Sequence, residues 1–286
     1  LEVLIERGDY RPLLEALLAP QGLGYGEHAK GLLPFHAYVD ESRTAFEEHL
    51  VEAAALVADA RRRCRVHFTV SSEHLDRFLA RLERVRSGHE ARFGVQCDVE
   101  FSVQKPSTDT LAADLDGRPF RAGDGTLLFR PAGHGALIEN LAELDADLAF
   151  LKNVDNVAID ALKPATLHWS RVLLGRLVEL QARVFELLLR LEDPRDQAAV
   201  DEALELSRAV LRREPPPGAA DHTPEQRRGY AIALLHRPLR VCGMVPNTGE
   251  PGGGPFWVRE RDGTPSLQIV EAAQVDWTSD AQREAL

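Results

Sequence analysis

The sequence has little of what a membrane-spanning protein or a secreted disulfide scaffold needs. Its longest apolar stretches fall far short of the roughly 20 residues of a spanning helix, and no secretory apolar segment opens the chain. Its three cysteines, Cys64, Cys97 and Cys242, are widely spaced and form no CxxC motif or Cys/His cluster. This argues against a disulfide framework and a zinc site, so we expect a protein of the reducing cytoplasm.

Positive charge is also scarce. The chain has 34 Lys and Arg residues against 45 Asp and Glu, which gives a formal net charge of -11 at pH 7. Nucleic acids and anionic membranes are bound by clustered positive potential, so this balance argues against both as partners. Small anions can still bind where a few basic side chains meet.

What the sequence does contain is an alternation of helical and strand-like segments. Its 286 residues allow one large domain or two small ones. Helix and strand alternate twice in the first half, over residues 44–63, 64–70, 73–85 and 97–104. A short helix over 135–144 and a buried strand over 146–155 continue the pattern. The alternation predicts an α/β fold with a parallel sheet covered by helices on both faces.

A helical segment interrupts this alternation. Leucine and valine recur at helical spacing between Leu173 and Leu191, and further helices are expected around 197–212 and from about 225. Strands return over 239–245, 255–260 and 267–275. We therefore predict a single α/β domain over 1–286 with a helical insertion at about 165–236. Because the chain begins at leucine in helical-looking sequence (1–20), we expect it to be a fragment of a longer protein.

Two polar residues end predicted strands, Gln104 and Asp155. In an open parallel α/β sheet, ligands bind at the carboxyl ends of the strands, so both side chains are expected at one crevice. Asp155 lies in "KNVDN" (152–156), between Asn153 and Asn156. A carboxylate there can hold a metal, cap a helix or simply end the strand, and the asparagines can orient it or form the turn.

Two glycine-containing segments add candidate anion sites. In "RPAGHGAL", Gly133 and Gly135 allow close backbone approach and positive φ, and the next helix offers free N–H groups. A tight strand-to-helix connection has the same sequence signature. In "GLGYGEHAKGLLPFH" (22–36), Lys30 suits a phosphate as a compact point charge, although a plain surface lysine fits equally well. In "RPLR", Arg237 and Arg240 could meet phosphate or lie on a solvated strand edge.

Taken in order, six segments resemble the UDP-sugar pyrophosphorylases, the UDP-glucose and UDP-N-acetylhexosamine uridylyltransferases. They are "AKGLLPF", "VHFTVSSEHLDRF", "FGVQCDVEFSVQ", "RPAGHGALIENL", "KNVDN" and "LQIVEAAQVD". The resemblance covers most of 22–160 and 238–276 and is strongest to an uncharacterised bacterial branch, a domain of unknown function with a nucleotidyltransferase-like core. It implies a Rossmann-like, GT-A-type sheet flanked by helices, with the helical insertion outside it.

The resemblance also implies roles for individual residues. Lys30 matches the lysine that neutralises phosphate, and Asp155 matches the aspartate that holds Mg²⁺, so these two are the candidate catalytic residues and Asp155 the metal ligand. Contacts with the uracil, the ribose and the rest of the nucleotide are implied for Gln104, Gly133, His134 and Gly135. Glu271 matches a glutamate that contacts sugar hydroxyls. Gly253, in "EPGGGPFWV" (250–258), belongs to a loop that suits a sugar site or a plain turn.

The implied activity is a Mg²⁺-dependent transfer of a nucleotide from a nucleoside triphosphate, UTP first, to a sugar 1-phosphate, with release of pyrophosphate. Such a reaction joins two anionic molecules, so catalysis is mostly positioning and charge neutralisation. A non-catalytic nucleotide-binding protein is the alternative, because the Gly-rich first loop of the relatives is absent from this chain. A GT-A-like glycosyltransferase is a third reading, against which the single aspartate of "NVDN" weighs.

Overall fold

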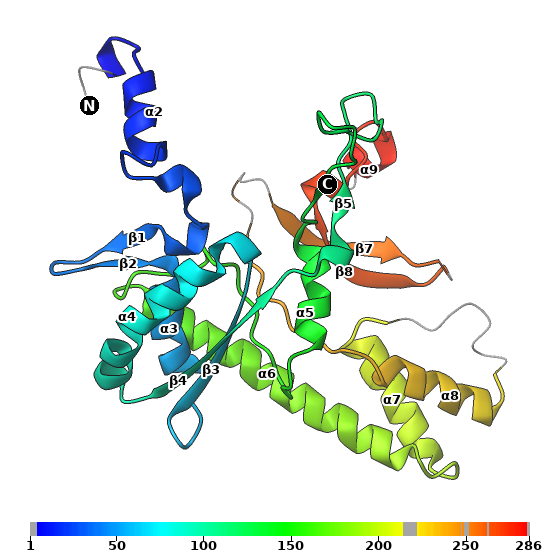
Figure 1. The fold of residues 1–286 in the computed structure, drawn as a ribbon. Helices are drawn as coiled ribbons and strands as arrows, with labels where there is room; N and C mark the ends of the chain where they lie inside the picture. Colours follow the sequence, from blue (N-terminus) through cyan, green and yellow to red (C-terminus); the bar gives the residue numbers. More distant parts are fainter. Residues whose placement is uncertain (1–4, 214–221, 247, 249–251, 262, 285–286) are drawn as a thin grey trace. The chain divides into compact units, whose positions relative to one another are not determined.

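The computed structural model describes residues 5–213, 222–246, 248, 252–261 and 263–284 (Figure 1). It is a mixed α/β structure that divides into two compact units, Leu1–Ser170 and Arg171–Leu286. The described residues form eight α-helices and four two-stranded sheets, none of which closes into a barrel. Whether the whole chain is one domain with a helical insertion stays a prediction.

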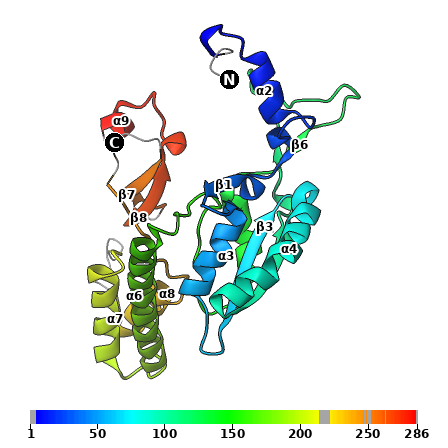
Figure 2. The same ribbon diagram turned by 90° about the vertical axis from the view of Figure 1, so that its left-hand side faces the viewer.

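The centre of the first unit is a pair of parallel strands, β3 (Arg63–Val70) and β4 (Gln96–Val103). They pair in continuous register, with Cys64 opposite Cys97. Helix α3 (Ala45–Leu56) precedes β3, and helix α4 (Leu75–Phe93) connects the two strands (Figure 2). The predicted alternation of helix and parallel strand is therefore confirmed here, as are the strand positions to within one residue.

Both helices pack on one face of this strand pair. Four phenylalanines from the four elements, Phe46, Phe68, Phe78 and Phe101, have ring centroids 4.8 to 6.1 Å apart. Alternation along β3 and β4 directs every second side chain to this face, which explains its apolar composition. Phe46 and Phe78 are almost fully buried, so the aromatic cluster fixes the helices on the strands.

The opposite face of the strand pair is polar and is met by a short helix, α5 (Ile138–Ala142). Its buried Asn140 donates to Ser102 Oγ (2.9 Å) and to the backbone oxygen of Val103 (3.0 Å). No third strand pairs with β3 or β4 in the described part of the chain. The expected Rossmann-like sheet is therefore not confirmed, and the described parallel sheet has two strands.

The helix boundaries follow from local sequence. Helix α3 begins with a capping box between Thr44 and Glu47 and ends at Leu56, short of the predicted residue 63. The reason is a turn in which Asp59 Oδ1 accepts from the backbone N–H groups of Arg61 and Arg63. Helix α4 runs past the predicted residue 85 until Gly94, whose φ of 60° ends it.

Shorter elements complete the first unit. Strands β1 (Pro34–Ala37) and β2 (Ser42–Thr44) form one antiparallel hairpin, and β5 (Thr110–Leu111) pairs antiparallel with β6 (Phe129–Arg130). Helix α2 (Arg11–Leu18) confirms helical structure near the N-terminus. Single 3-10 turns lie at Tyr25–Glu27, Ser72–His74 and Pro106–Thr108.

Two predicted strands are wrong. Residues 146–155 form no strand, and Leu148 and Leu151 are exposed. Residues 239–245 are irregular as well, with Met244 and Val245 exposed. Both segments have the apolar content of a strand, but neither pairs with a described strand, and their exposed apolar side chains do not pack in a core. Asp155 therefore does not end a strand.

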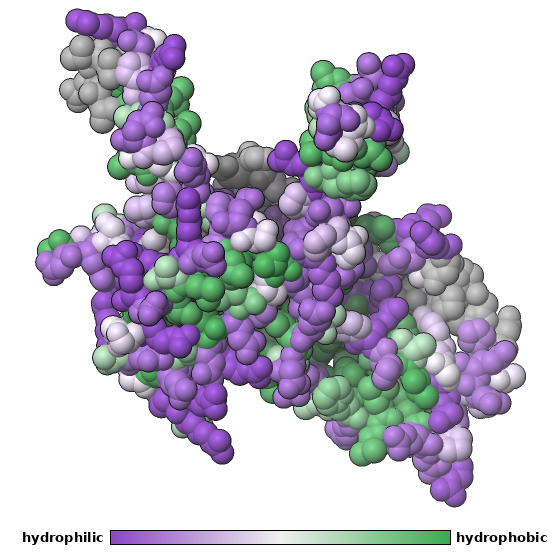
Figure 3. Space-filling model, viewed as in Figure 1, coloured by the Kyte–Doolittle hydropathy of each residue, from purple (hydrophilic) through white to green (hydrophobic). Residues whose placement is uncertain are grey.

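The second unit contains the predicted helices and a β-hairpin. Helix α6 (Lys163–Arg190), which begins in the first unit, is followed by α7 (Gln197–Ala209) and α8 (Pro224–Leu235). Their buried side chains form one cluster, which includes Leu187 and Leu191. The predicted break at 214–225 lies mostly outside the described residues. Figure 3 shows apolar surface over the region of these helices.

Strands β7 (Gly253–Arg259) and β8 (Pro265–Glu271) pair antiparallel, as the pattern predicted. A 3-10 turn (Ala272–Gln274) and helix α9 (Asp280–Glu284) follow the hairpin. Residues 250 and 251 of the glycine-rich segment lie outside the described part of the chain. Gly253 is in β7, so this part of the predicted loop is a strand.

Candidate functional site

The two candidate catalytic residues meet in the first unit. Lys30 lies in a 3-10 turn (Lys30–Leu32) before β1, and its Nζ donates a charged hydrogen bond to Asp155 Oδ2 from 125 positions away. The side chains are 63% and 37% exposed, respectively. An exposed ion pair between residues so distant in sequence is open to small molecules and contributes little stability of its own.

The segment that carries Asp155 is anchored on helix α3. Lys152 Nζ donates to Glu52 Oε1 (2.6 Å), and both side chains are nearly buried. His49 Nε2 donates to the backbone oxygen of Val154 (3.0 Å). A hydrogen bond from Asn156 N to Asn153 O (3.0 Å) closes the turn around Asp155. Asp155 thus lies in a turn between Asn153 and Asn156 and is partly exposed.

Gly31 lets this segment come close to the lysine turn. A Cβ on Gly31 would lie 3.0 Å from Val154 Cγ2 and 3.1 Å from Phe78 Cζ. Distances this short are rare between a Cβ and a carbon atom, so any larger residue would push Val154 away. The absence of a side chain at Gly31 therefore helps to set the distance between Lys30 and Asp155.

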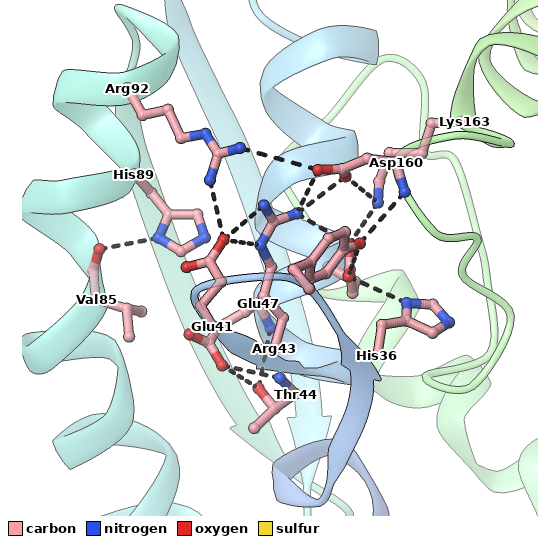
Figure 4. A network of polar contacts seen from close by, with 12 residues as sticks. His36, Glu41, Arg43, Thr44, Glu47, Val85, His89, Arg92, Asp160 and Lys163 are labelled. Atoms are coloured by element: carbon pink, nitrogen blue, oxygen red, sulfur yellow. Dashed lines mark hydrogen bonds and ion pairs between the residues drawn. The ribbon is translucent and has the colours of Figure 1, made fainter.

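A buried ionic network fixes the far end of the same segment (Figure 4). Lys163 Nζ donates to Glu48 Oε2, to the backbone oxygen of Ala158 (2.7 Å) and to Asp160 Oδ1 (3.0 Å). Arg43 Nη1 donates to both oxygens of Asp160 (2.9 and 3.0 Å). Residues between Lys152 and Lys163 are thus held at both ends by carboxylates of α3.

Glu48 is the centre of that network. Its side chain is fully buried and accepts from Lys163, from the hydroxyl of Tyr38 (2.5 Å) and from His36 Nδ1 (3.1 Å). Burial alone would raise the pKa of Glu48, but these hydrogen bonds lower it below its ordinary value. Burial and the hydrogen bond to Glu48 raise the pKa of Tyr38 to about 12. The carboxylate is therefore ionised and the phenol neutral near pH 7.

The candidate nucleotide residues lie in the same unit. Gln104 directly follows β4, and its Nε2 donates to Thr108 Oγ1 and to the backbone oxygen of Ala132 (3.3 Å each). His134 opens the 3-10 turn His134–Leu137. The hydrogen bond from Lys30 lowers the pKa of Asp155 below its ordinary value. The first unit thus brings Lys30 and Asp155 together and ties Gln104 to Ala132, the residue before Gly133.

The glycines beside His134 differ in one respect from expectation. Neither Gly133 nor Gly135 has a positive φ; Gly133 is extended, with φ -67° and ψ -173°. A Cβ on either residue would meet nothing within 4 Å. Neither backbone strain nor protein packing accounts for these glycines, and open space above them leaves room for a ligand to approach the backbone.

Glu271 and Gly253, the candidate sugar residues, belong to the second unit. They are direct register partners across β7 and β8. Gln274 accepts from the backbone N–H of Glu271 (2.9 Å) at the start of the following 3-10 turn. The hairpin therefore brings together two residues that are 18 positions apart in the sequence.

The donor set at Asp155 suits one kind of metal site only. The described residues contain no group of three or more His, Cys, Asp or Glu side chains poised to hold a metal. Mg²⁺ needs one or two carboxylates when phosphate oxygens and water complete its octahedron. Asp155 thus fits Mg²⁺ that arrives with a polyphosphate and does not fit a metal held by protein ligands alone.

The residues that anchor the site were not identified from the sequence. They are Glu48, Glu52, Lys152, Lys163 and His49. One signal was present, because Glu48 and Glu52 stand four residues apart, on one face of the alanine- and leucine-rich helix "AFEEHLVEAAAL". Charged residues within an apolar helix need partners, yet their partners lie 100 and 115 positions away and leave no local pattern.

These observations define a mixed α/β protein whose first unit contains two parallel strands and an exposed lysine–aspartate pair. The chain belongs to the family DUF4301, described as a domain of unknown function, whose family model matches residues 1–286. No curated protein and no solved structure matches the chain. Within the described residues, no helix has the length and apolar character to cross a membrane.

Proposed function

We propose that the protein is a Mg²⁺-dependent nucleotidyltransferase that joins a nucleoside triphosphate, UTP first, to a sugar 1-phosphate. The observation that carries the proposal is the exposed Lys30–Asp155 pair. One cation for phosphate and one carboxylate for Mg²⁺, side by side, are the minimum that phosphoryl-group chemistry requires from a protein.

The pair suits an exchange of partners on substrate binding. In the free protein Lys30 and Asp155 neutralise one another. A triphosphate offers Lys30 a more highly charged anion, and Asp155 would hold Mg²⁺, which would supply neutralisation of phosphate charge. The sugar 1-phosphate oxygen then attacks the α-phosphorus, the bond from this phosphorus to the β-phosphate bridge breaks, and pyrophosphate leaves with the electron pair. Lys30 stabilises negative charge that moves to the leaving group.

Gln104 supports a nucleotide base as the ligand. Its Nε2 is used by Thr108 and Ala132. Its Oε1 has no hydrogen-bond partner in the described structure and is free to accept the N–H of a base edge. Uracil offers such an N–H, as do guanine and adenine, so our choice of UTP as the first substrate rests on the segments that resemble uridylyltransferases.

The proposal is tested by binding and turnover with matched variants. We expect UTP with Mg²⁺ to raise the melting temperature. A ligand at 100 times its Kd adds about 2.7 kcal/mol to the free energy of unfolding. Lys30→Met should weaken UTP binding, and Asp155→Asn should abolish Mg²⁺-dependent pyrophosphate release while the fold is kept. Asp116→Asn makes the same charge change on an exposed loop and should behave like the wild type.

Each outcome decides between functions. Pyrophosphate release that survives Asp155→Asn would reject the metal assignment. Binding of UTP without turnover on any sugar 1-phosphate would favour the non-catalytic nucleotide-binding protein. Sugar transfer from UDP-glucose or UDP-N-acetylglucosamine to an acceptor would instead favour a GT-A-like glycosyltransferase.

A further inference from the structure

The second unit contains a cavity that the proposed function does not use. Its volume is about 410 Å³, within the range of small-molecule sites. Arg213, which follows α7, lines it together with Arg237, which follows α8, and Glu260 and Arg261, which follow β7. All of these residues belong to the second unit.

The charges around the cavity are unbalanced. Among the described residues that line it, three are arginines and one, Glu260, is a carboxylate. That carboxylate is already engaged, because it accepts from the hydroxyl of Ser266 and from Arg213 Nη1 (3.4 Å). The hydrogen bond from Ser266 and the charge of Arg213 lower the pKa of Glu260, so it stays ionised and neutralises Arg213. The guanidinium groups of Arg237 and Arg261 are then left without a carboxylate among the described residues that line the cavity.

Neither of these two side chains has a hydrogen-bond or ion-pair partner in the described part of the protein. The chain carries a net charge of -11, and many of its other arginines are paired with carboxylates. Two guanidinium groups left without a carboxylate on one concave surface favour an anion. Arginine presents a planar set of donors that matches the oxygens of a phosphate, which a lone ammonium does not.

The remaining lining gives the cavity an apolar wall. Ala233, Leu234 and the ring of Tyr230 line it from helix α8, on consecutive turns. An inorganic anion alone would leave this wall uncovered, whereas an organic group attached to the phosphate would cover it. We propose that the cavity binds a small phosphate monoester, with its phosphate on Arg237 and Arg261 and its organic part against α8.

The test uses phenyl phosphate and inorganic phosphate as probes. Binding is measured by titration calorimetry on the full chain carrying Lys30→Met, so that the lysine of the first unit does not contribute. We expect phenyl phosphate to bind more tightly than inorganic phosphate. Arg237→Ala and Arg261→Ala should each weaken phenyl phosphate binding at least tenfold.

Arg240→Ala is the matched control. Arg240 lies in the same "RPLR" segment as Arg237, donates to Gln268 Oε1 (3.2 Å) and does not line the cavity. The Arg240→Ala substitution removes one positive charge and should leave the affinity for phenyl phosphate unchanged. Equal weakening in all three variants, or no binding of phenyl phosphate by the parent protein, would overturn the proposal. If Arg237→Ala lowers the melting temperature without ligand, Arg237→Lys keeps the charge and should still weaken binding, because it loses the two-pronged contact.

Discussion

At the scale of single residues, the first unit depends on carboxylates that are kept charged inside the protein. Glu48 is fully buried and Glu52 nearly so, and each is paired with a lysine. A buried carboxylate is tolerated only when cations and hydrogen bonds replace the water it has lost. The lysines that do this, Lys152 and Lys163, bracket Asp155 in sequence. The ion pairs that neutralise the buried glutamates of α3 therefore also position Asp155, the candidate metal ligand.

Asp160 makes this network sensitive to acid. Burial alone would raise its pKa, but hydrogen bonds from Arg43 and Lys163 outweigh burial and lower it from 3.8 to about 2. Because the folded-state pKa is below the unfolded one, the stabilising contribution of Asp160 is complete above about pH 4. It is lost as pH falls through about 2.

Asp160→Asn should consequently reduce the dependence of stability on pH at the acid end. We expect the wild-type urea midpoint to fall between pH 4 and pH 2 by more than that of the variant. At pH 7 the variant should be the less stable protein, since it gives up the ion pairs with Arg43 and Lys163. Urea titrations at pH 2, 3, 4 and 7 measure this, with Asp116→Asn as the control. Parallel pH profiles for wild type and Asp160→Asn would contradict the network.

At the scale of elements, helix α3 organises the site. One face packs on β3 and α4 through Phe46, while Glu48 and Glu52 hold the segment that contains Asp155. That segment lacks secondary structure, so these contacts replace the sheet hydrogen bonds that were expected for it. An irregular segment pinned at both ends is a common way to present a functional side chain from a rigid scaffold.

The pair Lys152–Glu52 tests this anchoring. Lys152→Met leaves the Glu52 carboxylate buried without its cation, and we expect a loss of about 3 kcal/mol in the free energy of unfolding. The double variant Lys152→Met/Glu52→Leu removes both charges and should recover most of this loss. Urea denaturation of the wild type, both single variants and the double variant completes the cycle. A double variant no more stable than Lys152→Met would show that the ion pair does not anchor the segment.

How far the sequence predicts the structure is decided by whether a contact is local. Strands β3 and β4 and helices α6 to α8 could be predicted because the spacing of apolar residues that defines them involves only residues close in sequence. The segment "ADLAFLKNVD" was mistaken for a strand because its apolar residues satisfy the same pattern, while its actual partners lie about 100 positions away on α3. The meeting of Lys30 with Asp155 was implied only by resemblance to a family, since no spacing rule joins residues 125 positions apart.

At the scale of the whole molecule, the chain has separate hydrophobic cores. The core around Phe46 belongs to the first unit, and the core around Leu187 belongs to the second. The two clusters share no buried residue. Helix α6 begins in the first unit and continues into the second, so the two units are linked through its backbone. Units of this kind commonly open independently in the native state.

Core truncations in the two units should therefore have separate effects. Leu187→Ala removes a side chain that is 1% exposed and should cost about 2–5 kcal/mol, and Phe46→Ala, at 0% exposed, about 3–5 kcal/mol. In amide hydrogen exchange we expect Leu187→Ala to accelerate exchange in α7 and α8 and to leave β3 and β4 unchanged, and Phe46→Ala to do the reverse. If either variant accelerated exchange equally in both sets of elements, the units would unfold together, and ligand binding at Arg237 would then stabilise the Lys30 site as well.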